Sequence, residues 1–451
     1  MNIVIAGIGK FGKELTAELS TEKHNITIID SKSAVVEDIV NQYDVMGYTG
    51  NAASYNTQVE ALVNKADLFI ATTSNDEMNI LCCLVAKKLG VKQTIARLRN
   101  PEYAQQAQLM QNELGVNMSL NPDSDTAGEI YRIFRFPSAT KVESFANGRV
   151  SLVELKLEED SLLINKSLED IRKQFNAKIL ICAVNRLGEV IIPKGNFVLE
   201  EDDILYIIAD MSIMTHEFKK LKLFKNTLKS CLIIGGSKIT YNLAKQLIET
   251  GVSVKIIEKE KSVCELLCDS LPEALIIHGE GTNHKLLLEE GIETVDAVIT
   301  LTGMDETNIV ISSYAKSLGC EKVITKVNSS NYELILNSVG LTSIISPKEI
   351  FSNNIIRFVR GMENTMESEF KTLYRLVGNK VEALEFVISK ETNYTNIPIK
   401  DLKIKKGFLL GSIIRADKVI IPSGMDTLQP LDSVVIVTTN KNIKDISEIL
   451  E

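Results

Sequence analysis

The 451-residue chain has only four histidines and no excess of basic residues. Lysine and arginine number 50 against 59 aspartates and glutamates, so the formal net charge is −9. This balance argues against a broad electrostatic contact with nucleic acid or with an anionic membrane. We also find no basic helix-turn-helix or winged segment, which disfavours a redox-sensing transcription factor.

Long apolar runs are missing as well. No stretch reaches the roughly 18 apolar residues of a membrane-spanning helix. The first residues indicate a strand and a glycine-rich turn rather than a charged region followed by an apolar one. We therefore expect a cytoplasmic protein.

Cysteine is scarce and irregularly spaced. The seven cysteines show no CxxC pattern, so we expect buried, reduced thiols. Cys264 and Cys268 lie four residues apart and are followed by His278 and His284. That spacing fits no common structural zinc motif, and we predict no metal site.

What the chain does contain is a sequence that occurs twice. The segment 3–12 (IVIAGIGKFG) returns as 232–240 (LIIGGSKIT), and Gly235 follows Gly7 by 228 residues. Pro193 and Pro422 keep this offset to within one residue. A repeat that spans half the chain indicates two copies of a domain pair.

Each half begins with alternating strands and helices. In the first half we expect strands at 3–6, 26–30, 44–47, 68–72 and 94–98 and helices at 11–19, 34–42, 55–64 and 76–89. This alternation predicts an α/β fold with a Rossmann-like, doubly wound parallel sheet whose strand ends share one crevice. Further helices are expected at 102–114 and 123–134.

From about residue 142 the pattern changes to strands with few helices, which predicts a small α+β lobe. The basic stretch 219–229 is interpreted as a solvated linker. The four expected domains are Rossmann-like at 1–120 and 229–346 and small lobes at 138–222 and 368–451. An extra helix precedes each small lobe, and it can pack locally or swap across a dimer.

The strongest motif is a Gly-x-Gly-x-x-Gly turn between a strand and a helix. Gly7 permits a tight turn, Gly9 lets a pyrophosphate approach the backbone at the helix N-terminus, and Gly12 allows close helix packing. Asp30 ends the next strand and can accept ribose hydroxyls. The candidate nucleotide-binding residues of this turn are Gly7, Ile8, Gly9, Lys10, Phe11 and Gly12.

An acidic residue at position 30 favours NAD or NADH over NADP, because it repels a 2′-phosphate. It does not exclude ATP or ADP. Thr73 and Ser74 follow the fourth strand and are candidates for the crevice, although they equally suit a polar cap before Asp76. Arg97 and Arg99 lie at the end of the fifth strand, and we expect only one of the two to face the crevice.

The second copy departs from the motif at two glycines. Ser237 and Thr240 replace the second and third glycines, while Glu258 keeps the ribose position and Lys326 replaces Arg97. We expect this site to bind nucleotide more weakly or to be tuned to another ligand. Its candidate residues are Gly235, Gly236, Ser237, Lys238, Ile239 and Glu258.

No evident catalytic set accompanies these motifs. A dehydrogenase needs an acid or base presented to the nicotinamide, and neither His24 nor His216 is placed for that role. An NAD-dependent oxidoreductase stays the alternative, to be distinguished by turnover with candidate substrates.

The combination of the first glycine turn and Asp30 with 73–79 (TSNDEMN) and 95–103 (IARLRNPEY) resembles the RCK (KTN) nucleotide-binding domains of potassium transport regulators. The resemblance implies a cytoplasmic subunit that binds NAD(H), or ATP and ADP, with Arg97 near the nucleotide, and that forms a homo-oligomeric ring. The ring would lie at the inner face of the cell membrane, beneath a membrane potassium-translocating partner of the Trk or Ktr type. Nucleotide binding would change its shape.

Overall fold

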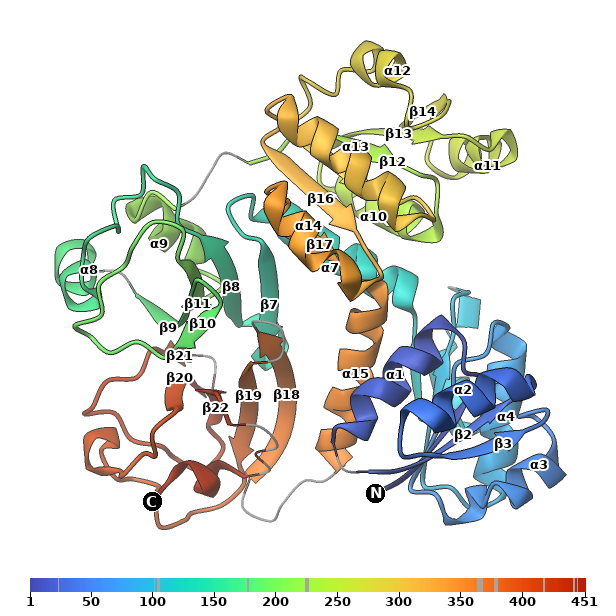
Figure 1. The fold of residues 1–451 in the computed structure, drawn as a ribbon. Coiled ribbons are helices and arrows are strands. Elements are labelled where there is room, and N and C mark those ends of the chain that lie inside the picture. The colour runs from blue at the N-terminus through green and yellow to red at the C-terminus, as the bar shows by residue number, and fades with distance from the viewer. Residues whose placement is uncertain are drawn as a thin grey trace. The chain divides into compact units, whose positions relative to one another are not determined.

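The computed structural model describes residues 1–451 apart from 23, 101, 104, 105, 177, 224–226, 363–367, 377–379, 417, 441, 442 and 444. The chain divides into two compact units (Figure 1). Unit 1 comprises Met1–Gly128, Ser237–Leu243 and Ile345–Ile356. Unit 2 comprises Glu129–Gly236, Ala244–Ile344 and Arg357–Glu451.

Unit 1 is built on a six-stranded parallel sheet in the order β3-β2-β1-β4-β5-β6. Its strands are β1 (Asn2–Ala6), β2 (Asn25–Asp30), β3 (Met46–Thr49), β4 (Leu68–Ala71), β5 (Gln93–Arg97) and β6 (Met118–Leu120). Its helices are α1 (Lys10–Ser20), α2 (Ser33–Gln42), α3 (Tyr55–Glu60), α4 (Asp76–Lys88) and α6 (Ala107–Asn112), with a 3₁₀ turn at Val63–Lys65. The strand order reverses between β1 and β4, which opens a crevice at the carboxyl ends of these strands.

The predicted doubly wound sheet is confirmed, with differences at element ends. β3 begins two residues later than expected. The expected helix at 55–64 stops at Glu60, because Leu62 adopts a left-handed conformation with φ of 55°. Of the helix expected at 102–114, the described residues show α6, and part of the prediction falls on residues outside the described chain.

Both extra helices are present, as α7 (Pro122–Arg135) and α15 (Pro347–Met362). In unit 1, the first half of α15 packs against the first repeat. The fully buried Phe351 ring meets Phe11 of α1 edge to face, with centroids 5.1 Å apart, and Asn354 Nδ2 donates to Asp125 Oδ2 at 3.1 Å. Within one chain, α15 therefore packs on the other repeat, which the sequence had left open.

Unit 2 contains the second parallel sheet, in the matching order β14-β13-β12-β15-β16-β17. Its strands are β12 (Ser230–Ile234), β13 (Ser253–Glu258), β14 (Leu275–His278), β15 (Ala297–Thr300), β16 (Lys322–Lys326) and β17 (Ser343–Ile345). The helices of this repeat are α10 (Lys238–Glu249), whose residues up to Leu243 belong to unit 1, and α11 (Lys261–Ser270), α12 (His284–Glu289), α13 (Asp305–Ser317) and α14 (Glu333–Ser338), with a 3₁₀ turn at Ser330–Tyr332. The same strand order in both sheets confirms the duplication.

Unit 2 also holds two antiparallel lobes of equivalent topology, β10-β9-β11-β8-β7 and β18-β19-β22-β20-β21. The first lobe contains β7 (Lys141–Phe145), β8 (Val150–Lys156), β9 (Ile179–Arg186), β10 (Glu189–Ile191), β11 (Ile204–Asp210), α8 (Leu168–Phe175) and α9 (Met214–Lys220). The second contains β18 (Ser368–Leu376), β19 (Val381–Ile388), β20 (Phe408–Arg415), β21 (Lys418–Ile420) and β22 (Ser433–Thr438). Short 3₁₀ turns lie at Ala146–Gly148, Ile399–Asp401 and Ile446–Ile449.

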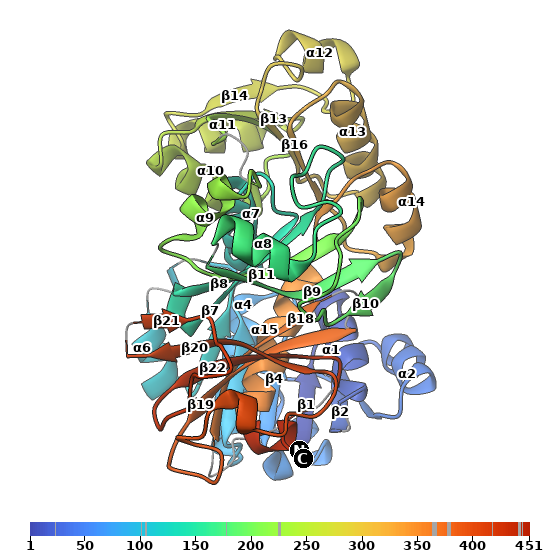
Figure 2. The same cartoon turned by 90° about the vertical axis from the view of Figure 1, so that its left-hand side faces the viewer.

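The two lobes share one hydrophobic core and lie side by side in Figures 1 and 2. Phe145 and Tyr206 of the first lobe belong to the same buried cluster as Val381 and Val435 of the second. Burial of such side chains removes apolar surface from water at about 25 cal/mol per Å², so the shared core stabilises the pairing of the two lobes.

The basic linker predicted at 219–229 is wrong over its first part, because residues 214–220 form helix α9. Met214 and Phe218 lie four residues apart and are both buried, so the helix is held by an apolar face. The acidic turn of the first lobe also has a structural role. Buried Asp203 accepts hydrogen bonds of 2.8 and 2.7 Å from Arg186.

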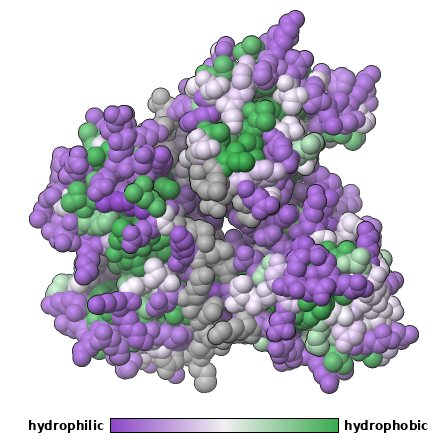
Figure 3. Space-filling model, viewed as in Figure 1, coloured by the Kyte–Doolittle hydropathy of each residue, from purple (hydrophilic) through white to green (hydrophobic). Residues whose placement is uncertain are grey.

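The prediction of buried, reduced thiols is confirmed for six of the seven cysteines and wrong for Cys268, which is exposed. Burial raises the pKa of Cys82 and Cys182 to about 12. The described residues contain no cluster of histidine, cysteine and acidic side chains suited to a metal ion. Among the helices of the described residues, none has the length and apolar character needed to span a membrane. The face of the molecule drawn in Figure 3 is mostly hydrophilic, with separate hydrophobic patches.

Candidate functional site

Three glycines shape the turn between β1 and α1. Gly7 has φ of 88°, and a Cβ there would lie 2.7 Å from Thr73 N. A Cβ on Gly12 would lie 2.1 Å from Gly7 O. Gly9 differs, because a Cβ there would meet nothing within 4 Å. Packing explains the first and last glycines, whereas the middle one keeps the backbone open toward the crevice.

Helix α1 begins next to this open backbone without a side-chain cap. Gly9 is its N-cap residue, and no described side chain bonds to the first turn. The first N–H groups of a helix carry partial positive charge and bind anions readily. The start of α1 is therefore suited to a phosphate group.

Asp30 fixes the turn from the end of β2. Its Oδ2 accepts a hydrogen bond from Ile8 N at 2.7 Å, and its Oδ1 accepts one from Lys32 N at 3.0 Å. The carboxylate thus joins the glycine turn to the loop before α2 while lining the crevice.

The crevice is a cleft of about 520 Å³, within the range of small-molecule sites. Its walls include six predicted residues, namely Gly7, Ile8, Gly9, Asp30, Thr73 and Ser74. Lys32, Asn51 and Met78 also line it, although the sequence did not single them out. Four predicted residues, Lys10, Phe11, Gly12 and Arg97, are not on its walls.

A buried asparagine on α4 holds the loop that carries Thr73. Asn79 Oδ1 accepts hydrogen bonds from Thr73 N at 2.8 Å and Thr73 Oγ1 at 2.7 Å, and Asn79 Nδ2 donates to Arg97 O at 2.8 Å. Asn79 has no exposed surface. The sequence reasoning missed this residue, although an asparagine on the buried face of an amphipathic helix was a signal.

Thr73 and Ser74 are not the cap of α4. Asn75 is the N-cap, and its side chain accepts a hydrogen bond from Met78 N at 2.7 Å. The cap interpretation of Thr73 and Ser74 is therefore wrong, and both residues line the cleft instead.

Arg97 lies directly behind Thr73. Its side chain is 7% exposed, donates from Nη2 to Thr73 O at 2.6 Å, and lies over the Phe11 ring at 5.2 Å from the centroid. Its Nε has no partner among the described residues, and burial together with Arg99 lowers the pKa of Arg97. Within the described chain no ion pair joins Arg97 to a carboxylate, although Asp76 and Asp123 lie near enough to act on its charge, so this buried cation favours negative charge at the neighbouring wall.

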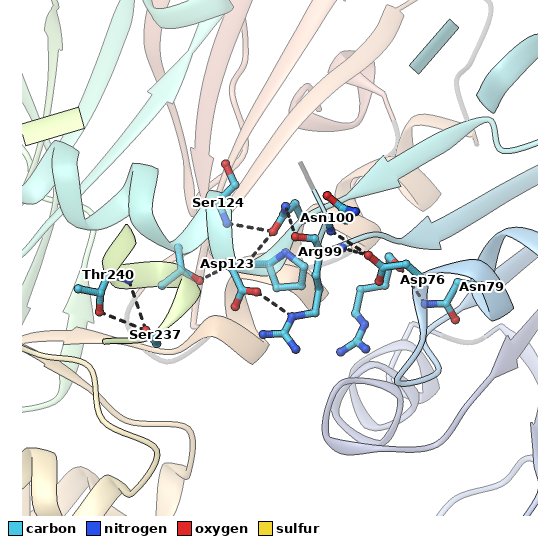
Figure 4. Close-up of polar contacts among 12 residues, drawn as sticks. Asp76, Asn79, Arg99, Asn100, Asp123, Ser124, Ser237 and Thr240 are labelled. Atoms are coloured by element: carbon cyan, nitrogen blue, oxygen red, sulfur yellow. Dashed lines mark hydrogen bonds and ion pairs between the residues drawn. The ribbon is translucent and has the colours of Figure 1, made fainter. Parts of the chain in front are cut away.

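Arg99 points elsewhere. Its Nε donates to Asp123 Oδ2 at 2.7 Å, while Asp76 Oδ2 accepts from Arg99 N at 2.7 Å and Asn100 N at 2.8 Å (Figure 4). These contacts tie the end of β5 to the start of α4 and to α7.

The second copy repeats this scaffold. Asn308 Oδ1 accepts from Thr302 N at 2.9 Å and Thr302 Oγ1 at 2.7 Å, and Asn308 Nδ2 donates to Lys326 O at 2.9 Å. Glu258 accepts from Gly236 N at 2.5 Å and from Glu260 N at 2.8 Å. Gly235 has φ of 105° and repeats the close approach of Gly7.

The start of the following helix differs. Ser237 Oγ accepts a hydrogen bond from Thr240 N at 3.3 Å and lies 3.2 Å from Thr240 Oγ1 (Figure 4). Lys238 is exposed and Ile239 is buried. The second copy thus keeps the frame of the crevice and changes the turn.

Two Rossmann-like sheet domains, each followed by an antiparallel lobe, define a tandem nucleotide-binding type of fold. The TrkA-N domain model matches residues 3–122 and 231–347, and the TrkA-C domain model matches residues 152–221 and 383–451. The chain belongs to the TrkA family.

Curated relatives are similar in sequence to this chain over nearly its whole length. The chain is 32% identical over 451 residues to a Trk system potassium uptake protein TrkA homolog of Archaeoglobus fulgidus, with 100% of both chains covered. It is 31% identical over 444 residues to TrkA homolog 1 of Methanosarcina mazei, with 97% of each covered.

Solved structures share the fold at low identity. The GsuK RCK domain has a TM-score of 0.65 at 18% identity, covering 98% of this chain and 92% of that one. The GsuK channel bound to NAD has a TM-score of 0.65 at 18% identity, covering 98% of this chain and 77% of that one. GsuK bound to ADP has a TM-score of 0.50 at 15% identity, covering 79% of this chain and 69% of that one. These likenesses confirm the RCK fold.

Proposed function

We propose that the chain is a nucleotide-binding regulatory subunit of a potassium uptake system. The observation that carries this proposal is the cleft of the first repeat, where the uncapped start of α1, Asp30 and the Thr73 loop meet. Gly7 to Phe11 would hold the phosphates, Asp30 the ribose, and Thr73 and Ser74 the opposite wall, with Arg97 adding positive charge behind it. The names of the TrkA relatives supply the link to potassium uptake.

The ligand we favour is NAD or NADH, with ATP or ADP as the alternative. Asp30 suits the free ribose hydroxyls of all four and disfavours a 2′-phosphate. The same fold is known in GsuK with NAD and with ADP, which supports a choice between these two chemistries. We assign no catalytic residue, so the nucleotide acts as a signal rather than as a reactant.

Regulation requires that nucleotide binds two conformations with different affinity, because equal affinity shifts no equilibrium. We propose that copies of the chain form a ring beneath a membrane potassium-translocating subunit of the Trk or Ktr type. The protein would be cytoplasmic and reach the membrane through that partner. The four domains, at 1–120, 138–222, 229–346 and 368–451, would be the moving parts.

The test is an NADH fluorescence titration of the purified full chain, followed by competition with NAD, ATP and ADP. Asp30→Ala should weaken binding at least tenfold, because the carboxylate that orients the turn is lost. Glu258→Ala is the matched control, since Glu258 makes the same two backbone contacts in the second copy.

The same variants are then placed in cells with the membrane partner, and potassium uptake is followed while the nucleotide pool is changed. Asp30→Ala should uncouple uptake from the pool. A normal nucleotide response in Asp30→Ala would overturn the regulatory proposal. Turnover of a candidate substrate would favour an oxidoreductase instead.

A further inference from the structure

We infer that unit 2 contains a separate ligand site, a cleft between the first small lobe and the second parallel sheet, and that this cleft takes a small zwitterion of the amino-acid type. The cleft has a volume of about 410 Å³, within the range of small-molecule sites. All the residues that line it belong to unit 2. It shares none of them with the nucleotide cleft of the first repeat, so the inference goes beyond the proposed function.

The cleft lies at the edge of the second sheet that is opposite to the glycine turn. Lys322 is the first residue of β16 and Ser343 is the first residue of β17, so both lie at the amino ends of parallel strands. Nucleotides bind at the carboxyl ends of such strands. The facing wall comes from the connection before β7 and from the end of β8 with the loop after it. A ligand in this cleft would therefore bridge the first lobe and the second repeat.

Two of the residues that line the cleft are polar and buried. Lys322 is 5% exposed, and its Nζ donates hydrogen bonds to Pro137 O at 3.0 Å and to Ala139 O at 2.5 Å. Both acceptors lie in the connection before β7, so Lys322 ties the two walls together. Ser343 is 1% exposed, and its Oγ has no hydrogen-bond partner within the described chain. A buried hydroxyl without a partner costs free energy, so this position favours a ligand atom that supplies one.

The two walls of the cleft differ in their balance of charge. The charged residues that line them are Lys316, Lys322 and Glu321 from the second repeat and Lys156, Asp202, Glu158 and Glu159 from the first lobe. Lys156 Nζ lies 2.7 Å from Asp202 Oδ1, so the charges of this pair offset each other. The rest of the lobe wall is acidic, whereas lysines outnumber acids on the wall from the second repeat.

A ligand with charge of one sign suits only one of these walls. An anion would meet the acidic lobe wall, and a cation would meet the buried ammonium group of Lys322. A zwitterion can place its carboxylate toward Lys322 and Ser343 and its ammonium group toward the lobe wall, so that each end lies near opposite charge. The carboxylate also accepts a hydrogen bond from a hydroxyl, which would give Ser343 Oγ its partner. Leu157 and Leu341 line the cleft and are buried, which suits a short aliphatic body.

The experiment is a calorimetric titration of the full chain with four free amino acids, namely glycine, alanine, valine and leucine. Isovalerate and isobutylamine are then titrated as the two halves of valine, because each keeps the aliphatic body and one of the charged groups. At least one amino acid should bind, and valine should bind at least about tenfold more tightly than either half, since a half-molecule leaves one wall without an opposite charge.

The key variant is Ser343→Ala, which removes the hydroxyl that has no partner. The Tm should stay the same or rise, because the loss of an unsatisfied buried hydroxyl costs nothing, whereas amino-acid affinity should fall by about tenfold. Ser412→Ala is the matched control. Ser412 is also fully buried with an Oγ that lacks a partner within the described chain, but it lies in β20 and does not line the cleft. Its Tm should respond in the same way, and its affinity should not change.

Two exposed residues test the charged ends of the ligand. Glu159→Gln and Lys316→Gln should each weaken amino-acid binding by about two- to fivefold, because exposed ion pairs are weak. Asp160→Asn is the control, since Asp160 is exposed beside Glu159 but does not line the cleft. It should leave the affinity unchanged.

Binding of an amino acid that is weakened in Ser343→Ala and kept in Ser412→Ala supports the inference. Isovalerate or isobutylamine that binds as tightly as valine would overturn the choice of a zwitterion. Equal affinity in the parent chain and in Ser343→Ala would overturn the assignment to this cleft. If none of the four amino acids binds, the inference is wrong, and the NADH titration of the same chain still tests the proposed function separately.

Discussion

Replacing Asn79 by alanine should loosen the wall of the first cleft and weaken nucleotide binding. Asn79 is fully buried and makes hydrogen bonds to Thr73 N, Thr73 Oγ1 and Arg97 O at 2.7 to 2.8 Å. Alanine provides none of these partners. The loop that carries Thr73 would lose its attachment to α4 and to β5.

The loss of stability expected for Asn79→Ala follows from the polar groups that are left without a hydrogen-bond partner. Thr73 Oγ1 keeps a contact to Asn75 O at 3.2 Å, whereas Thr73 N and Arg97 O lose their side-chain partner. An unsatisfied buried group costs about 1–3 kcal/mol, so Asn79→Ala should destabilise unit 1 by about 3 kcal/mol. We expect nucleotide affinity to fall at least tenfold, or about 1.4 kcal/mol.

Asn308→Ala is a close control, because Asn308 makes the same three contacts in the second copy at 2.7 to 2.9 Å. Its stability loss should be similar, and the affinity for nucleotide should not change. Amide hydrogen exchange at Thr73 and Thr302 reports the local loosening in each variant, and calorimetric titration with NADH reports affinity.

Two results would refute this reasoning. Equal losses of affinity in both variants would mean that the effect is global or that both crevices bind. Rapid exchange at Thr73 without loss of affinity would mean that the Thr73 loop is not part of the site.

Four further predictions concern single residues. Arg97→Met removes a buried cation, so we expect stability to be kept. In titrations at two ionic strengths, the affinity for NADH and the salt dependence of that affinity should both fall. An unchanged affinity would contradict the contribution of the Arg97 charge. Phe351→Ala removes a fully buried ring that packs on α1, so it should lower the free energy of unfolding in urea by about 3–5 kcal/mol. A loss below about 1 kcal/mol, close to the range of about ±0.5 kcal/mol that is typical of surface changes, would show that α15 does not stabilise the first repeat. Burial raises the pKa of Asp296, but hydrogen bonds from Lys229 N and its neighbour outweigh burial, so the pKa is lowered. The parent should therefore be more stable than Asp296→Asn at neutral pH, and this difference should disappear below about pH 4. A stability difference that does not depend on pH would contradict this prediction. Native alkylation followed by mass spectrometry should label Cys268 first, and Cys268→Ser should remove that label; early labelling of another thiol would contradict the burial described here.

Most of the site frame was predictable from local sequence. The glycine turn, Asp30 and the alternation of strands and helices each depend on neighbouring residues, and the structure has them as expected. Errors occurred where a local pattern suited two structures. The stretch 219–229 was interpreted as linker from its charges, although its first two residues end helix α9, which buries Met214 and Phe218.

Asn79 and Arg97 show why part of the site was not predictable. Asn79 bonds to residues of two other elements, so its role appears only when α4, the Thr73 loop and β5 meet. Arg97 was assigned to the nucleotide from the resemblance to RCK domains. Its long side chain instead turns behind the wall, toward Thr73 O and Phe11.

By itself, the sequence determined the duplication, the two parallel sheets and the position of the intact glycine turn, because these follow from periodicity and from the backbone freedom of glycine. Only the tertiary structure decided which contacts join the repeats. Phe351 meets Phe11 across most of the chain length, and the two small lobes bury one common core. Such pairings depend on how whole elements pack, and a local pattern in the sequence does not record which distant surface an apolar face will cover.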